Sequence, residues 1–372
     1  MLKVVIAAVG LAICVGAAQA GGQAGAGGQA GAGRQAGAGG EAGAGATAGQ
    51  QAPARVRQAV VVVSIAPLKG LVEPLLPAGT TVEMIIPPGV SEHGYEVPPS
   101  KLALLLKADL VVLAGLGLEP QFEKFLAANP IPAERRSVVR LAEVAGIKAT
   151  AEHDHDDHED DNKGHAGHDH AHGGGGADPH VWLDPVAAMK LVPAVASALR
   201  AIGPQIGQPK EDLDHREGLL IAKLQRLDSM YKASIATSQR KKIVVAHDAY
   251  GHLARRYGFE TIAIAGLTAA EPSPGAIAQA VKTIKAEKIP VVFVEPQLSP
   301  AAAKRVAERA GVKTRVLDPL GTGDYFKFME SNLDALMEGL GGTKVDPSGA
   351  NVPAPGAQPA KPSLPSAAPT GR

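Results

Sequence analysis

Cysteine is almost absent from this chain of 372 residues, in which Cys14 is the only one. Because Cys14 lies in an apolar run near the N-terminus, the chain after that run can form no disulfide. The lack of thiolates also disfavours copper(I) sites and iron–sulfur clusters. Aromatic residues are scarce as well, at 3% of the chain, and Trp182 is the sole tryptophan. Any metal site here would therefore rely on imidazoles and carboxylates.

An excess of charge of either sign is also missing. The 37 Lys and Arg residues balance 37 Asp and Glu residues, so the formal net charge is zero at neutral pH. The basic residues are scattered and form no stripe, which predicts neither a nucleic-acid partner nor binding to an anionic membrane surface. The length suffices for one large domain or two medium ones, and we expect two lobes.

The N-terminus has the layout of a cleaved signal peptide over residues 1–20. A charged start is followed by an apolar stretch from Val4 to Ala18 and by a small-residue site at Ala18, Gln19 and Ala20. The apolar stretch is shorter than the roughly 20 residues of a spanning helix, which disfavours a retained anchor. A lipid on Cys14 is a further alternative, but Ile13 is bulky where lipoprotein signals favour a small residue. We therefore expect a periplasmic protein.

Two segments of low complexity flank the central part of the chain. Residues 21–57 repeat a Gly-Ala-Gln theme with almost nothing apolar to bury, which predicts a flexible spacer. Residues 342–372 are rich in Pro, Ala and Ser and should form a disordered tail.

Apolar strands and helices alternate between these segments. VVVVSIAPL, from Val60 to Leu68, indicates a buried strand that ends at a loop, and a helix over Lys101 to Lys107 should precede a strand over Asp109 to Ala114. The alternation predicts the α/β class, with two (β/α) lobes built on mostly parallel sheets. We place the lobes at residues 58–207 and 237–341.

One long amphipathic helix should join the lobes over residues 208–236. Apolar residues recur there at spacings of three, four and seven, and Gly218 is its only weak point. Such a helix would be a rigid connector, although a helix belonging to one lobe has the same pattern.

Four candidate metal ligands or ligand pairs lie where predicted strands end or in the loops beyond them, where α/β folds bind their ligands. They are His93 with Glu92 in a Pro/Gly-rich loop, His180 in DPHVWLDP, His247 directly after IVVA, and Asp318 after RVL. Each alone has an ordinary interpretation, as a solvated histidine or an N-capping aspartate. Together, three imidazoles and a carboxylate form a tetrahedral set suited to zinc, whereas calcium and magnesium prefer oxygen ligands. We expect the site in the cleft between the lobes.

A second group of histidines lies in residues 151–176, where histidine alternates with carboxylates before four glycines. This run is too polar to pack and predicts a mobile loop. Its sites should be weak and interchangeable, because each binding event must also order the chain. The candidate accessory ligands are His153, His155, His158, His165, His168, His170 and His172.

The motifs GVSEHGYEVPPS, DPHVWLDP, HDAYGHLARRYG, VEPQLSP and LDPLG, in this order, closely resemble the ZnuA-like, zinc-specific solute-binding proteins of bacterial ABC importers. The resemblance spans Val60 to Leu340 and implies two lobes with a metal between them. It implies His93, His180 and His247 as ligands, with Asp318, Glu92 or water in the fourth position. Manganese-type relatives carry a carboxylate in place of His247, which argues for zinc. Some zinc-type members have a disulfide in the second lobe, which this chain cannot form.

Several functions follow as hypotheses. The resemblance implies a non-enzymatic, monomeric carrier that captures Zn²⁺ and delivers it to a membrane ABC permease with its cytoplasmic ATPase. Another divalent metal such as manganese is the alternative cargo. A zinc hydrolase also holds its metal with three ligands, but HExxH is absent, and Glu295 fits a partner that orients a ligand histidine better than a general base. An adhesin or metal-storage protein is a third class, motivated by the low-complexity ends and the histidine-rich run.

Overall fold

The computed structural model describes residues 57–132, 135–148 and 177–347, all within one compact unit that begins at Pro53. The predicted signal peptide (residues 1–20), the histidine-rich run (residues 151–176) and nearly all of the predicted spacer and tail lie outside the described residues.

The first lobe is built on a parallel sheet of four strands in the order β2-β1-β3-β4. Valine and leucine fill β1 and β3, and both strands are fully buried, as expected for the centre of a parallel sheet covered by helices. The strands are β1 (Val61–Val63), β2 (Val82–Met84), β3 (Leu110–Leu113) and β4 (Ser137–Arg140). The helices are α1 (Ala66–Val72), α2 (Pro99–Lys107), α3 (Pro120–Ala128), α4 (Leu141–Ala145) and α5 (Pro185–Ile206), with short 3₁₀ turns η1 (Glu73–Leu75) and η2 (Val181–Leu183).

The first predicted strand is shorter than expected. The prediction of a strand from Val60 to Leu68 was wrong in its length, because β1 ends at Val63 and α1 begins at Ala66. Pro67 stands in the first turn of α1, where its missing N–H costs no helical hydrogen bond. The proline therefore starts a helix at the end of the strand, which brings the first βα connection close to the carboxyl edge of the sheet.

The second lobe repeats the architecture with strand order β6-β5-β7-β8, again parallel. The strands are β5 (Lys242–His247), β6 (Glu260–Ala265), β7 (Val291–Val294) and β8 (Lys313–Val316). The helices are α7 (Gly251–Tyr257), α8 (Pro274–Glu287), α9 (Ala301–Ala310) and α10 (Tyr325–Leu340). Two parallel sheets, each with helices, confirm the predicted fold class.

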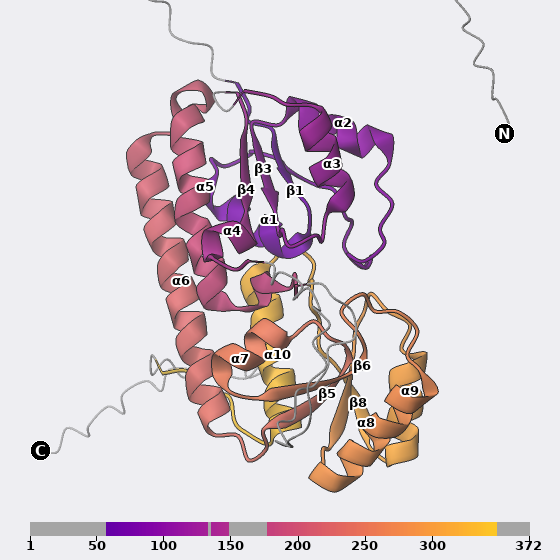
Figure 1. The fold of residues 1–372 in the computed structure, drawn as a ribbon. Helices are drawn as coiled ribbons and strands as arrows, with labels where there is room; N and C mark the ends of the chain where they lie inside the picture. The colour runs from indigo at the N-terminus through magenta and orange to yellow at the C-terminus, as the bar shows by residue number, and fades with distance from the viewer. Residues whose placement is uncertain (1–56, 133–134, 149–176, 348–372) are drawn as a thin grey trace, which may run out of the picture. The chain divides into compact units, whose positions relative to one another are not determined.

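Helix α6 (Lys210–Ala236) runs past both sheets in Figure 1 and joins the two halves of the fold. Its buried side chains recur at helical spacing and include those of Leu213, Leu220, Leu224, Leu227 and Tyr231. Gly218 does not interrupt the helix, which continues for 27 residues. A single uninterrupted helix of this length is stiff, in keeping with the predicted rigid connector.

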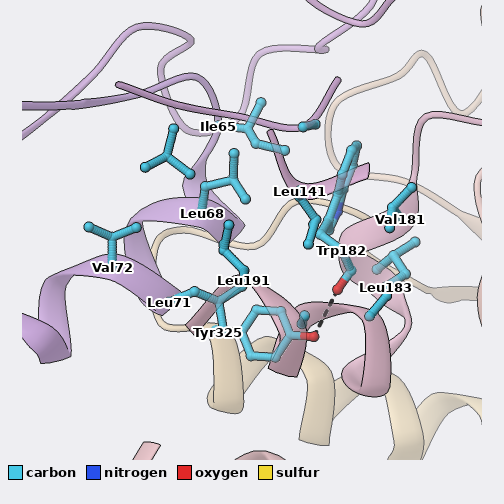
Figure 2. Close-up of a cluster of buried hydrophobic side chains, with 14 of the residues drawn as sticks. Ile65, Leu68, Leu71, Val72, Leu141, Val181, Trp182, Leu183, Leu191 and Tyr325 are labelled. Carbon is cyan, nitrogen blue, oxygen red and sulfur yellow. Dashed lines mark hydrogen bonds between the residues drawn. The ribbon is translucent and has the colours of Figure 1, made fainter. Parts of the chain in front are cut away.

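Side chains from both halves meet in the core around Trp182 and Tyr325 (Figure 2). The Tyr325 hydroxyl donates to the backbone oxygen of Trp182 at 2.8 Å, and the Trp182 indole N–H donates to the backbone oxygen of Pro319 at 2.7 Å. Pro319 and Tyr325 belong to the second half of the chain, so the segment around Trp182 ties the two halves together.

Helix α5 is the one helix among the described residues that is long and apolar enough to cross a membrane, judged by length and composition. Half of its most apolar window is buried inside the protein, and the core helix of a globular fold passes the same test. It packs along α6, with its apolar face in the core.

Candidate metal site

Four side chains from three distant parts of the chain converge between the lobes. Glu92 and His93 lie in the irregular loop after β2, His180 directly precedes η2, and His247 is the last residue of β5. One ligand atom from each lies within 4.8 Å of the ligand atoms of the others. The chain thus brings three imidazoles and one carboxylate to a single point.

The three imidazoles face one another through the same ring nitrogen. Nε2 of His180 lies 3.1 Å from Nε2 of His93 and 3.3 Å from Nε2 of His247. A zinc ion bound tetrahedrally at about 2.0–2.1 Å holds two nitrogen ligands about 3.3 Å apart. The observed separations therefore match a zinc ion bound to all three Nε2 atoms.

Glu92 completes the group with a buried oxygen that has no hydrogen-bond partner. Its Oε1 atom lies 3.5 Å from Nε2 of His180 and 3.8 Å from Nε2 of His93. Burial alone would raise the pKa of this carboxyl, but its interaction with His180 lowers the pKa below its usual range. A buried, ionised carboxylate oxygen without a hydrogen-bond partner is costly unless a cation lies beside it.

His180 is held by a second carboxylate behind it. Its Nδ1 lies 2.8 Å from Oδ1 of Asp178, which also accepts the backbone N–H of His180 at 3.0 Å. Burial would raise the pKa of Asp178, but the hydrogen bond with His180 lowers it, so the carboxylate is ionised and only accepts. Nδ1 therefore carries a proton, which leaves Nε2 as the nitrogen that faces the group.

His247 has a similar carboxylate partner. Its Nδ1 lies 2.7 Å from Oε2 of Glu295, and both side chains are 1% exposed. The contact is short, although its alignment falls short of a hydrogen bond. Burial raises the pKa of Glu295, and the contact with His247 partly opposes that shift. Glu295 thus occupies the orienting position that the sequence predicted for it.

The pKa values of the two neighbouring imidazoles move in opposite directions. Burial lowers the pKa of His93 to about 4, with Glu92 opposing the shift. Burial also acts against the charge of His180, but its interactions with Asp178 and Glu92 outweigh it and raise the pKa to about 9. In the metal-free protein at neutral pH, His93 is neutral and His180 is protonated.

Asp318 lies outside this group. Its Oδ1 accepts the side-chain amide of Gln297 at 2.8 Å and the backbone N–H groups of Leu320 and Gly321 at 3.0 and 2.9 Å. Asn332 bonds the backbone of Asp318 on both sides, at 2.9 and 2.6 Å. These bonds stabilise the turn after β8, whereas the N-cap of α10 is Asp324, so Asp318 is not the N-capping residue that its ordinary interpretation suggested.

Sequence reasoning missed the contacts that support His180. Asp178 was noted only as part of DPH, although an Asp two residues before a histidine can reach the ring of that histidine. His252 and Arg256 were not singled out, yet both contact the DPHVWLDP segment. Their spacing of four residues on one helix was the available signal. The seven candidate accessory histidines, from His153 to His172, lie outside the described residues.

Fold and site together define a metal-binding protein with two α/β lobes. A family model described as ZnuA, the periplasmic component A of a zinc-uptake complex, matches residues 61–339. The chain belongs to the ZnuA family. Membership confirms the predicted resemblance and a binding protein rather than an enzyme.

Named relatives agree with this assignment. Over 277 residues the chain is 33% identical to the zinc-binding lipoprotein AdcA of Streptococcus pneumoniae, covering 70% of this chain and 52% of AdcA. Over 294 residues it is 31% identical to the high-affinity zinc uptake system protein ZnuA of Bacillus subtilis, covering 75% of this chain and 87% of the relative. The match thus spans about half the length of AdcA but most of the Bacillus protein.

Solved structures show the same fold. A crystal structure of ZnuA superposes with a TM-score of 0.63 at 25% identity, covering 76% of this chain and 99% of the other. The Zn(II)-bound ZnuA-like domain of Streptococcus pneumoniae AdcA superposes with a TM-score of 0.60 at 28% identity, with the same coverage of 76% and 99%.

Proposed function

We propose that this protein captures a zinc ion outside the cytoplasm with His93, His180, His247 and Glu92 as its four ligands. The observation that carries the proposal is the convergence of three Nε2 atoms, with His180 at 3.1 and 3.3 Å from the other two, beside a buried carboxylate oxygen that has no hydrogen-bond partner. Three nitrogens and one oxygen suit zinc better than manganese, which prefers carboxylate and water ligands. Zinc would be the transported ion and not a resident cofactor.

Delivery to a membrane ABC permease and its cytoplasmic ATPase completes the proposal, supported by the description of the family as part of a zinc-uptake complex. The protein would act as a periplasmic monomer after removal of residues 1–20. A lipid anchor at Cys14 is the alternative, and the lipoprotein AdcA supplies a precedent for anchoring among relatives.

The proposed organisation keeps lobes at residues 58–207 and 237–341, with the connector at 208–236. Within it, the histidine-rich run at residues 151–176 would collect zinc at weaker sites and leave the tight site intact. The low-complexity ends would not take part in binding.

Two isosteric substitutions test the ligand set. Glu92→Gln removes the charge from the proposed fourth ligand, and Asp318→Asn is the matched change at the other candidate. Calorimetric zinc titration should show Glu92→Gln weakening binding by more than the roughly 10–100-fold that is typical of residues that only orient a ligand. Asp318→Asn should leave the affinity close to that of the wild type. The reverse ranking would contradict the proposed ligand set.

A further inference from the structure

The segment from Asp178 to Asp184, here named the interlobe strip, precedes α5 and contacts the second lobe at every other residue. The contacts run from Asp178 to His252, from His180 to His247, from Trp182 to Pro319, and from Asp184 to Arg256. His180 is therefore one of four consecutive contacts that hold the two lobes in register.

Two of these contacts are hydrogen bonds to the same face of α7. Nε2 of His252 lies 2.9 Å from the backbone oxygen of Asp178 and 3.7 Å from its Oδ2. Arg256, one turn further on, donates to both carboxylate oxygens of Asp184, through Nε at 3.0 and 2.9 Å and through Nη2 at 2.7 Å. Residues four apart lie on one side of a helix, so the strip holds α7 at both ends.

The strip comes close to the first residue of α7, so that a larger residue there would displace the Asp178 carboxylate. A Cβ atom on Gly251, the first residue of α7, would lie 2.7 Å from Oδ2 of Asp178. Asp184 is 5% exposed, and it also caps α5 by accepting the backbone N–H of Val186 at 2.9 Å. The carboxylate that holds Arg256 is therefore itself fixed in place.

Helix α7 and His247 are close neighbours along the chain. Helix α7 follows β5 after only three residues, and His247 is the last residue of that strand. Asp178 holds both the His180 ring and the start of α7. One short segment thus fixes the two imidazoles relative to each other, although they are 67 residues apart in the chain.

We propose that Asp178 and Asp184 are positioning residues that hold α7 in place and so set the separation of His180 and His247. This separation would favour zinc over ions whose coordination number and geometry vary more. The inference rests on the proposed function and extends it to metal selectivity. Zinc takes four ligands at short, nearly fixed distances, so displacement of one imidazole weakens its binding directly. Ions that accept more ligands, including water, lose less when one imidazole moves.

The test uses the full chain with Arg256→Gln, which removes the Asp184 contact without touching a proposed ligand. Zinc and manganese dissociation constants are measured by competition with a chelator. The visible spectrum of the Co²⁺-loaded protein is recorded as well, because four-coordinate Co²⁺ absorbs more strongly than six-coordinate Co²⁺. We expect zinc affinity to fall about tenfold with little change for manganese, and the Co²⁺ absorption to weaken. Arg256→Lys keeps the positive charge but lacks the planar guanidinium that donates to both oxygens of one carboxylate. This variant should therefore keep more of the zinc selectivity than Arg256→Gln.

The matched control is Arg140→Gln, which removes an arginine–carboxylate pair of the same kind within the first lobe. Arg140 donates to Glu123 at 2.6 and 2.7 Å, and this pair lies outside the metal group and the strip. The control should lower thermal stability without changing selectivity or the Co²⁺ spectrum.

Gly251→Ala displaces Asp178 at the other end of α7 and removes no charge, so it carries the test if Arg256→Gln does not fold. If the wild type binds zinc tightly but both variants lose equal affinity for zinc and manganese, or keep the wild-type selectivity, the positioning role is overturned and the proposed function is not. A wild-type protein that binds no zinc would instead overturn the proposed function.

Discussion

The Nδ1 atom of His247 rests against a buried carboxylate, and this pairing gives Glu295 a testable effect on metal affinity. The 2.7 Å contact directs the opposite nitrogen, Nε2, toward His180. Glu295→Gln keeps the shape but removes the charge that supports the imidazole, and should weaken zinc binding by about 10–100-fold in a calorimetric titration. Glu123→Gln, a matched change away from the metal group, should leave the affinity unchanged. Equal affinities for Glu295→Gln and the wild type would exclude an orienting role.

The proton held by His180 predicts how zinc affinity depends on pH. Buried among carboxylates, His180 has its pKa raised to about 9, whereas that of His93 is lowered to about 4. Zinc must displace the proton from Nε2 of His180 but finds His93 already neutral. Binding at neutral pH should therefore release about one proton, and affinity should rise about tenfold per pH unit until it levels off near pH 9.

Titration at pH 7 in two buffers with different ionisation enthalpies counts the released protons. A count near zero, or an affinity that is flat between neutral pH and pH 9, would contradict this protonation state. Loss of affinity confined to pH values below about 6.5 would indicate unperturbed histidines instead.

Sequence alone could single out the residues that the structure brings together, but not the contacts that support them. His93, His180 and His247 could be picked out because polar residues beyond strand ends meet at one edge of a parallel sheet. Choosing between Glu92 and Asp318 required coordinates, because both are carboxylates near strand ends. The proposal of Glu92 rests on which carboxylate oxygen lacks a hydrogen-bond partner, and that depends on side-chain packing that no periodicity encodes.

Among the elements, α6 offers a substitution that separates stability from binding. Gly218 lies within the helix, and a Cβ atom at this position would meet nothing within 4 Å. Gly218→Ala should therefore stabilise the protein by about 0.5–1 kcal/mol, since alanine loses less conformational entropy in a helix. Chemical denaturation measures the gain, and zinc affinity should stay unchanged. A lower stability would show that α6 bends or is interrupted at Gly218.

Element types were predictable from the sequence, but element ends were not. The valine-rich runs predicted the central strands correctly, because a strand that is buried on both faces needs apolar side chains on both of them. The predicted strand from Val60 to Leu68 was too long. Apolar residues such as Ile65, Ala66 and Leu68 occur both in buried helices and in buried strands, so their hydrophobicity does not show where the strand ends. The pairing of Arg256 with Asp184 could not be seen at all, because it joins residues that are 72 positions apart.

In the molecule as a whole, we expect one tight zinc site and a separate set of weak ones. Deleting Glu152 to His172 should remove the weak zinc capacity and leave about one tightly bound zinc per chain, because the four proposed ligands all lie outside that segment. Native mass spectrometry of the intact and shortened proteins counts the ions. Loss of all zinc on deletion would favour a storage protein.

The central claim is that one zinc ion binds between the lobes to His93, His180, His247 and Glu92. Anomalous diffraction at the zinc edge, from crystals of protein purified without a histidine tag, tests it most directly. We expect one strong peak about 2.0–2.2 Å from the three Nε2 atoms and from a carboxylate oxygen of Glu92. A strong peak bound by Asp318, or no peak among the three imidazoles in zinc-loaded crystals, would contradict it.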